Sequence, residues 1–217
     1  MKKAGRYKDR QEMVSRQILC RRIKDSAVID AFLEVPRHLF VPNSESKNSY
    51  SDSPLPIGRG QTISQPYIAA LMTESLGLAP GQKVLEVGTG SGYQAAILAC
   101  LGAQVYSIER YAFLAKAAEN RLLSLGCKVK IKIGDGSEGW QQEAPFDRII
   151  VTAAMPALPQ ALLDQLTLGG RLVVPLEAES GGQELILAEK ISPKEIKKKR
   201  LCACIFVPLI GRYGYKE

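Results

Sequence analysis

The sequence predicts an α/β fold, a doubly wound and mainly parallel sheet with helices on both faces, preceded by a helical N-terminal region. Two observations support this prediction. From Lys83 onward, strand-like and helix-like segments alternate, as they do when crossover helices join parallel strands. Between Met13 and Leu33, apolar residues instead recur at helical spacing.

The composition fits a single globular domain over residues 1–217. With 46% hydrophobic and 24% charged residues, a chain of this length buries roughly 70% of its unfolded surface. We expect residues 1–80 to form N-terminal helices and a substrate loop, and residues 81–217 to form an α/β core that binds a cofactor. No apolar run approaches the ~20 residues of a membrane span, and no apolar segment follows the basic N-terminus. The sequence therefore predicts a cytoplasmic protein with no membrane partner.

The elements follow one another in a simple order. Two or three helices are expected before residue 35, then a loop rich in Pro, Ser and Asn at 35–58, and a helix that starts at Pro66 and stops near Gly77. The last three strands follow one another without an intervening helix, which favours antiparallel pairing at that end of the sheet. The expected core strands are 83–87, 103–109, 128–136, 146–154, 171–176, 184–191 and 202–210, and the expected core helices are 93–102, 111–126 and 158–166.

Charge and cysteine content narrow the functional classes. Five cysteines without C-x-x-C spacing and a single histidine, His38, predict reduced thiols and no metal site. Much of the net charge of +7 lies in the first ten residues and in the run from Lys194 to Arg200. Because no aromatic residues are interleaved for base stacking, we interpret this run as a solvated loop between strands and predict no specific nucleic-acid partner. A weaker alternative is that it attracts anionic substrates.

A glycine-rich turn, "VLEVGTGSGY", joins the first core strand to its helix. Gly88, Gly90 and Gly92 have G-x-G-x-G spacing, with Tyr93 where a dinucleotide fingerprint has its third glycine, and no G-K-[ST] follows. Glycine permits a tight turn and a close approach of a ligand to the main chain. The pattern disfavours NAD and triphosphates, and it leaves other adenosine ligands open.

Three acidic residues accompany the turn. Glu109 ends the second core strand, 21 positions after Gly88, where a carboxylate can accept hydrogen bonds from ribose hydroxyls, and Asp135 ends the third. Glu86 lies inside the first strand, where a buried carboxylate is costly unless paired, so it either faces the crevice or contacts backbone amides. Carboxylates favour a cation, and S-adenosyl-L-methionine combines an adenosine, an amino-acid part and a sulfonium.

The chain resembles the protein-L-isoaspartate O-methyltransferases from about Met13 to Gly211. The resemblance rests on "MVSRQI", "VPRHLFVP", "PLPIGRGQTISQPYIAALMTESL", "VLEVGTGSGYQAAILA", "VYSIER", "GDG", "FDRIIVTAA", "LPQALLDQLTLGGRLVVPL" and "FVPLIG". The glycine and acidic motifs are general to methyltransferases, whereas "PLPIGxGQTIS" and "FVPL" are specific. Two departures are Arg59, where a histidine is common, and "LEAESGGQEL", which is longer than in some relatives and leaves the loop around Gly181 undefined.

This resemblance implies a seven-stranded Rossmann-like methyltransferase sheet with unusual placement of its last two strands. It implies transfer of a methyl group from S-adenosyl-L-methionine, giving S-adenosyl-L-homocysteine, to the free α-carboxylate of L-isoaspartyl residues in damaged proteins, which initiates repair. We also expect a monomer. By motif, the implied cofactor-binding residues are Ile63, Glu86, Gly88, Gly90, Gly92, Glu109, Arg110, Asp135 and Gly136. The implied substrate-binding residues are Thr62, Ser64, Val207, Pro208 and Leu209, with Ser64 as the catalytic residue.

The implied chemistry defines what Ser64 does. An α-carboxylate has a pKa of roughly 3.3–3.7, so at neutral pH it attacks the sulfonium methyl without a base, a covalent intermediate or a metal. No histidine or lysine stands in a recognisable triad with Ser64, and we interpret His38 as structural. We therefore expect Ser64 to orient the carboxylate by a hydrogen bond, while alignment supplies most of the rate enhancement.

Two other functions stay open on the sequence alone. The chain could methylate a small molecule or RNA, although "TAAMP" (residues 152–156) lacks the Asn/Asp-Pro-Pro-aromatic segment of many base amino-methyltransferases. It could also be a non-catalytic nucleotide- or RNA-binding module, which predicts strongly salt-dependent RNA affinity and no methyl transfer.

Overall fold

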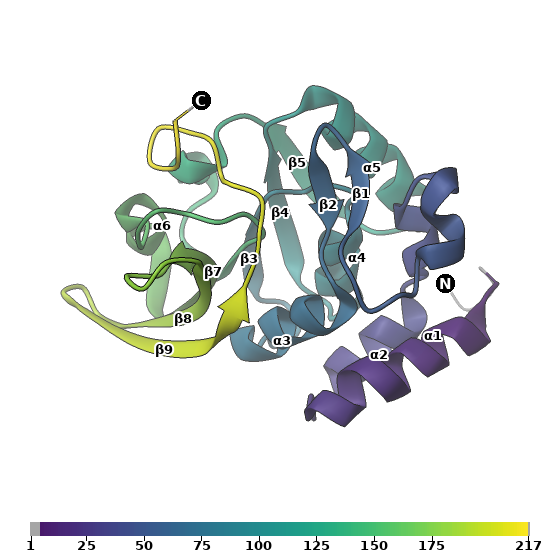
Figure 1. The fold of residues 1–217 in the computed structure, drawn as a ribbon. Coiled ribbons are helices and arrows are strands. Elements are labelled where there is room, and N and C mark those ends of the chain that lie inside the picture. The colour runs from purple at the N-terminus through teal and green to yellow at the C-terminus, as the bar shows by residue number, and fades with distance from the viewer. Residues whose placement is uncertain (1–4, 217) are drawn as a thin grey trace.

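A computed structural model of the chain describes residues 5–216 and contains the predicted sheet (Figure 1). Its seven strands lie in the order β5-β4-β3-β6-β7-β8-β9. Neighbours from β5 through β7 pair in parallel, whereas β7–β8 and β8–β9 pair antiparallel. The antiparallel pairs were predicted because no helix-like segment separates the last strands. The strands are β3 (Lys83–Val87), β4 (Gln104–Glu109), β5 (Val129–Ile133), β6 (Phe146–Val151), β7 (Leu166–Glu177), β8 (Gln183–Ser192) and β9 (Glu195–Cys204).

Alternate residues of each central strand face two separate hydrophobic cores. Val84 and Ile150 face the core that also contains residues of the N-terminal helices, α3, α4 and α5, while Leu85 and Ile149 face the core that contains α6. Helices thus cover both faces, as predicted. The helices of this part are α3 (Pro66–Leu76), α4 (Tyr93–Cys100), α5 (Ala112–Ser124) and α6 (Gln160–Asp164). None of the helices within 5–216 is long and apolar enough to cross a bilayer.

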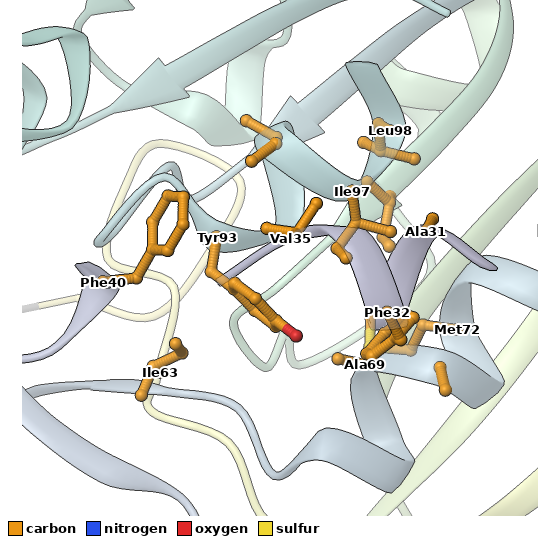
Figure 2. Packing of buried hydrophobic residues seen from close by; sticks show 14 of the residues in the cluster. Ala31, Phe32, Val35, Phe40, Ile63, Ala69, Met72, Tyr93, Ile97 and Leu98 are labelled. Carbon is orange, nitrogen blue, oxygen red and sulfur yellow. The ribbon is translucent and has the colours of Figure 1, made fainter. Parts of the chain in front are cut away.

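The N-terminal helices pack directly on α4, the helix that follows the glycine-rich turn. α1 (Tyr7–Met13) continues as a π-helical turn (Val14–Ile18) and a 3₁₀ turn (Leu19–Arg21), and α2 (Ser26–Glu34) follows. Asp25 caps α2 by accepting hydrogen bonds from two backbone amides of its first turn. Figure 2 shows Tyr93 of α4 between Phe32 and Phe40, whose ring centroids lie 6.0 and 5.3 Å from that of Tyr93.

The segment predicted as a loop over residues 35–58 contains regular structure. It forms two 3₁₀ helices (Arg37–Phe40 and Asn43–Asn48) and strand β1 (Leu55–Gly58), which pairs antiparallel with β2 (Gln61–Ile63). Both residues of the connecting turn have positive φ, 55° at Arg59 and 70° at Gly60. This is the backbone of a two-residue type I′ hairpin, whose twist matches that of the flanking strands. Arg59, noted as a departure from the family pattern, therefore lies in a turn.

The prediction for the C-terminal strands was wrong in two respects. The basic run is not a solvated loop, because β9 begins at Glu195 and Lys197 pairs opposite Glu189 of β8. β9 forms the outer edge of the sheet, where charged side chains discourage pairing with another chain. β9 also ends at Cys204, and residues 205–210 leave the sheet and cross the carboxyl end of β6. There Pro208, which has no N–H for a ladder, forms a bridge with Ala154.

The loop around Gly181 is the turn between β7 and β8. The amide of Ala178 donates to the carbonyl of Gly182 at 3.0 Å, and Gly181 and Gly182 have φ values of 87° and 80°. At the other edge, β5 carries the alternating lysines. β5 is the first strand in the sheet order, so the prediction of an edge strand is confirmed. One of its lysines, Lys130, forms an ion pair with Glu143.

Candidate active site

A cleft opens at the carboxyl ends of β3, β4 and β6, where open parallel sheets bind ligands. The β1–β2 hairpin and residues 207–210 form its other walls. It brings together most of the predicted site residues: Thr62, Ile63, Ser64, Glu86, Gly88, Gly90, Glu109, Arg110, Gly136, Val207, Pro208 and Leu209. Two predicted residues, Gly92 and Asp135, do not line it.

The three glycines of the turn have different tasks. Gly88 has φ 95°, and a Cβ there would lie 2.4 Å from Oγ1 of Thr152. Gly90 has φ 52° and donates its amide to the cleft-lining carboxylate of Glu109. Gly92 has φ 87°, and a Cβ there would lie 3.2 Å from the Cβ of Ala118. Gly92 thus allows α4 to start close against α5, which is a packing role rather than contact with a ligand.

Glu109 holds the glycine turn in place. Its side chain accepts hydrogen bonds from the amides of Gly90 at 2.8 Å and Tyr111 at 2.9 Å, and the residue is buried. Each carboxylate oxygen accepts two hydrogen bonds. Both oxygens therefore keep a free lone pair, which suits the predicted interaction with two adjacent hydroxyls.

Glu86 is the most perturbed acid of the cleft. It is fully buried; Oε2 accepts a hydrogen bond from Ser107, while Oε1 has no hydrogen-bond partner among the residues described. Burial, assisted by the nearby charge of Glu109 and opposed by the Ser107 hydrogen bond, raises the pKa of Glu86 to about 8. An unpaired buried carboxylate is costly, so a cationic group in the cleft would relieve this cost. Glu86 is among the residues that line the cleft, and the backbone of Ala95 also lowers its pKa, so both predicted environments are present.

Asp135 stabilises the structure beside the cleft instead of lining it. It accepts hydrogen bonds from the amide and hydroxyl of Ser137 and from the amide of Arg212 at 2.6 Å. Partial burial would raise the pKa of Asp135, but these hydrogen bonds outweigh burial and lower it. Gly136 does line the cleft, and a Cβ there would lie 2.5 Å from Cγ1 of Val87.

A second, mainly apolar cavity adjoins the first at the hairpin. Thr62 and Ser64 line both cavities, because alternate residues of an extended segment face the same side. The side chain of Gln183 donates to the carbonyl of Phe206 and accepts from its amide, at 3.1 and 2.6 Å, which fixes one wall. The remaining lining residues are Pro54, Gln65, Ile68, Ala203, Cys204, Ile205 and Phe206.

Several residues of the cleft were missed by the sequence analysis. Thr152 follows β6 directly and donates to the carbonyl of Gly88 at 2.7 Å. Its place after a parallel strand could have identified it, by the same rule that identified Glu109 and Asp135. The other missed residues are Gln61, Ala69, Val87, Thr89, Ser91, Tyr93, Gln94, Tyr111, Ala153 and Ile210.

His38 lines neither cavity, and its Nδ1 lies 2.7 Å from the hydroxyl of Tyr50. This contact agrees with the interpretation of His38 as a structural residue. Within residues 5–216, no group of three or more His, Cys, Asp or Glu residues is placed to hold a metal ion.

The sheet topology and this cleft define a Rossmann-like methyltransferase that uses S-adenosyl-L-methionine. The family model for protein-L-isoaspartate(D-aspartate) O-methyltransferase matches residues 8–214. The chain belongs to this family, and it is a protein carboxyl O-methyltransferase that acts on L-isoaspartyl residues in damaged proteins.

Individual relatives agree along nearly the whole chain. The protein-L-isoaspartate O-methyltransferase 2 of Geotalea uraniireducens is 53% identical over 207 residues, 95% of each chain. A solved protein-L-isoaspartate O-methyltransferase superposes with a TM-score of 0.86 at 30% identity, covering 94% of this chain and 67% of its own. A Plasmodium falciparum structure is described as a putative protein-L-isoaspartate O-methyltransferase in complex with S-adenosyl-L-homocysteine. It has a TM-score of 0.80 at 27% identity, and the match covers 93% of this chain and 98% of the other.

Proposed function

We propose that Ser64 orients the acceptor carboxylate at the boundary between the two cavities, with the cofactor in the cleft and the isoaspartyl segment in the apolar cavity. The observation that supports this role is that Thr62 and Ser64 line both cavities. A hydroxyl at that boundary can donate to a carboxylate that enters from the apolar cavity and faces the cofactor in the cleft. Ser64 is half-buried, so part of its surface stays accessible to a ligand.

The residues of the cleft fit the cofactor. Glu109 offers lone pairs to the ribose hydroxyls, and the unpartnered Oε1 of Glu86 offers a buried anion to the cationic amino-acid part. Ile63, Gly88, Gly90, Arg110 and Gly136 complete the walls. When bound, S-adenosyl-L-methionine supplies a methyl group on a positively charged sulfur. We propose no cofactor contact for Gly92 and Asp135, which act by supporting the turn and the segment around Arg212.

The protein's own contribution is alignment and exclusion of water. Because the acceptor carboxylate is already ionised at neutral pH, the chain need not hold a general base. Val207, Pro208 and Leu209 cover the carboxyl end of β6, where the amide of Leu209 donates to Ala154 at 2.8 Å. This ordered cover limits water around the reacting groups, and a fixed donor at Ser64 limits the orientations of the carboxylate.

The decisive experiment compares two peptides that differ in one linkage. The enzyme is incubated with methyl-labelled cofactor and a peptide carrying L-isoaspartate, beside the same peptide carrying normal aspartate. Base-labile label on the first peptide alone, lost in Ser64→Ala, supports the proposal. Label on RNA or a small molecule instead would support the alternative acceptor, and RNA binding without any transfer would support the non-catalytic module.

We also propose that residues 1–217 form one domain, with N-terminal helices and a substrate loop in 1–80 and the cofactor-binding core in 81–217. The shared core of Phe32, Phe40 and Tyr93 supports this division into two parts of one unit. We propose a cytoplasmic monomer without a specific nucleic-acid or membrane partner. The unpaired cysteines, of which Cys20 is exposed, support a reducing compartment. Sedimentation of the purified protein would test the monomer.

A further inference from the structure

Arg37 is a fully buried cation directly behind the proposed acceptor site. Its side chain is 0% exposed, and Nη2 donates to the carbonyl of Ser64 at 2.8 Å. Nε donates to the carbonyl of Ser49, also at 2.8 Å. The guanidinium thus ties the loop before the hairpin to the residue at the boundary of the two cavities.

The guanidinium also contacts the wall of the cofactor cleft. Its central carbon lies 5.0 Å from the ring centroid of Tyr93, which lines that cleft and which Figure 2 places in the core beside Phe40. A cation over an aromatic face is favourable but does not neutralise the charge. Arg37 is therefore held by carbonyls and a ring, all of them uncharged.

Within residues 5–216, no carboxylate forms an ion pair with Arg37. Its Nη1 has no hydrogen-bond partner among these residues either. Burying a charge without a counter-ion is costly, and burial lowers the pKa of Arg37 accordingly. An anion that bound beside Ser64 would offset that cost.

From this arrangement we infer that Arg37 is a positioning and specificity residue, which holds the main chain of Ser64 and makes the acceptor site selective for an anionic group over a neutral one of the same shape. This inference rests on the proposed position of the acceptor at Ser64. It also accounts for release of the product, because methylation removes the negative charge that Arg37 favours.

The molecule supplies a matched control in Arg10. Arg10 is also 0% exposed, donates at 2.8 Å to two carbonyls, those of Leu33 and Gly5, and forms no ion pair within the described part of the chain. Neither carbonyl belongs to a residue of the two cavities. Arg10→Gln therefore measures the cost of removing a buried guanidinium without touching the acceptor site.

The test measures charge selectivity rather than activity alone. Dissociation constants are determined by calorimetry, with S-adenosyl-L-homocysteine bound, for an isoaspartyl peptide with a free α-carboxylate and for the same peptide with an α-carboxamide. We expect Arg37→Gln, which keeps a donor but loses the charge, to reduce the preference for the carboxylate about tenfold. Arg37→Lys should keep the preference within about threefold but lower kcat, since it loses the planar hold on two carbonyls.

A purely structural role would give a different pattern. Arg37→Gln would then weaken the binding of both peptides equally, as Arg10→Gln would if that variant loosened the fold. An unchanged ratio of the two dissociation constants in Arg37→Gln overturns the inference. Melting temperatures are compared for all variants, and Arg37→Met replaces Arg37→Gln if the latter does not fold, because apolar replacement of a buried ion is often tolerated. Normal turnover by Ser64→Ala would refute the proposed acceptor position, an outcome separate from the preference at Arg37.

Discussion

The two walls of the catalytic cleft are built in different ways. The cofactor wall is held by main-chain ladders of the sheet: the amide of Gly88 donates to Ile108 at 2.9 Å, and the amide of Thr152 donates to Val87 at 2.9 Å. The acceptor wall consists of a short hairpin and an irregular C-terminal segment. Main-chain bonds also occur here, within the hairpin and between Ala154 and residues 207–209, but the two pieces depend in addition on side chains, Arg37 at Ser64 and Gln183 at Phe206.

This difference separates the effects that substitutions should have. A change of a side chain on the cofactor wall leaves the ladders intact, so it should alter cofactor affinity without disturbing the acceptor. A change on the acceptor wall removes part of what holds the wall, so it should alter turnover or peptide affinity. Each of the following experiments tests whether the effects on the two walls are separate.

The largest effect is expected for Ser64→Ala. Loss of one hydrogen bond to a charged acceptor should lower kcat by roughly tens to hundreds of fold, with cofactor affinity kept within about twofold. Steady-state kinetics with an isoaspartyl peptide and calorimetry with the cofactor measure the two quantities. Ser124→Ala, on the exposed surface of α5, is the control. Unchanged turnover would remove Ser64 from the site.

Glu109→Ala should act on the cofactor. It removes the carboxylate proposed for the ribose and leaves the amides of Gly90 and Tyr111 without their acceptor. We expect the KM for S-adenosyl-L-methionine to rise about tenfold to thirtyfold, with a smaller change in kcat. Glu109→Gln, which keeps one acceptor oxygen, should lose less. A fall in kcat at constant KM would contradict the ribose role.

Glu86 should make cofactor binding depend on pH. Its ordinary pKa of 4.5 is raised to about 8, so in the free protein it is largely protonated at pH 6.5 and must release a proton to bind a cation. Relative to Glu86→Gln, which shows only the titration of the cofactor itself, the cofactor affinity of the wild type should therefore rise by roughly twentyfold from pH 6.5 to 8.5. Calorimetry in buffers of different ionisation enthalpy measures the released proton, and equal release by both proteins would argue against this role.

The same raised pKa has a consequence for the free protein. Because the folded-state pKa of Glu86 exceeds its unfolded value, its contribution to stability is fully present below about pH 4.5 and is lost as pH rises through about 8. Glu86→Gln should therefore gain stability relative to the wild type between these values. Urea unfolding of the cofactor-free protein at pH 6 and 8 measures this difference.

The smallest effect is expected for Gln183→Leu. Two hydrogen bonds to the backbone of Phe206 are lost, so the KM for the isoaspartyl peptide should rise about threefold while the cofactor KM stays constant. Hydrogen exchange of the Phe206 amide should accelerate. Gln104→Leu, which loses an exposed hydrogen bond to Gly81, is the control. A larger effect on the cofactor than on the peptide would show that the two walls are coupled.

Periodicity was sufficient for the parallel part of the sheet, but not for its antiparallel end. The central strands β3, β4 and β6 are buried on both faces and therefore carry a strong apolar signal, and β5 is marked by its strict alternation of lysine with Val or Ile. β9 carries the run "EIKKKR" on an exposed edge, so its hydrophobic signal is absent and only pairing with β8 makes it a strand. The hairpin at Arg59 was missed because its turn uses a non-glycine residue at positive φ.

For the site, motif positions predicted which residues converge, while side-chain contacts decided their roles. Glu86, Glu109 and Ser64 line the cleft, as the motifs predicted, and their roles there stay proposals. Asp135 and Gly92 follow the same motifs, yet hydrogen bonds to Arg212 and packing against Ala118 direct them away from it. The task of Arg37 could not be predicted, since "VPRHLFVP" gives no indication that its guanidinium reaches a carbonyl 27 positions later in the chain.

The basic edge strand has a consequence for how this enzyme meets its substrates. Damaged proteins expose unpaired backbone, and an open sheet edge is a template that such a chain could extend into a growing aggregate. Lys197, Lys198, Lys199 and Arg200 occupy consecutive positions of β9, so both faces of that edge carry positive charge. These charges therefore oppose the pairing of an exposed client strand with this edge of the enzyme.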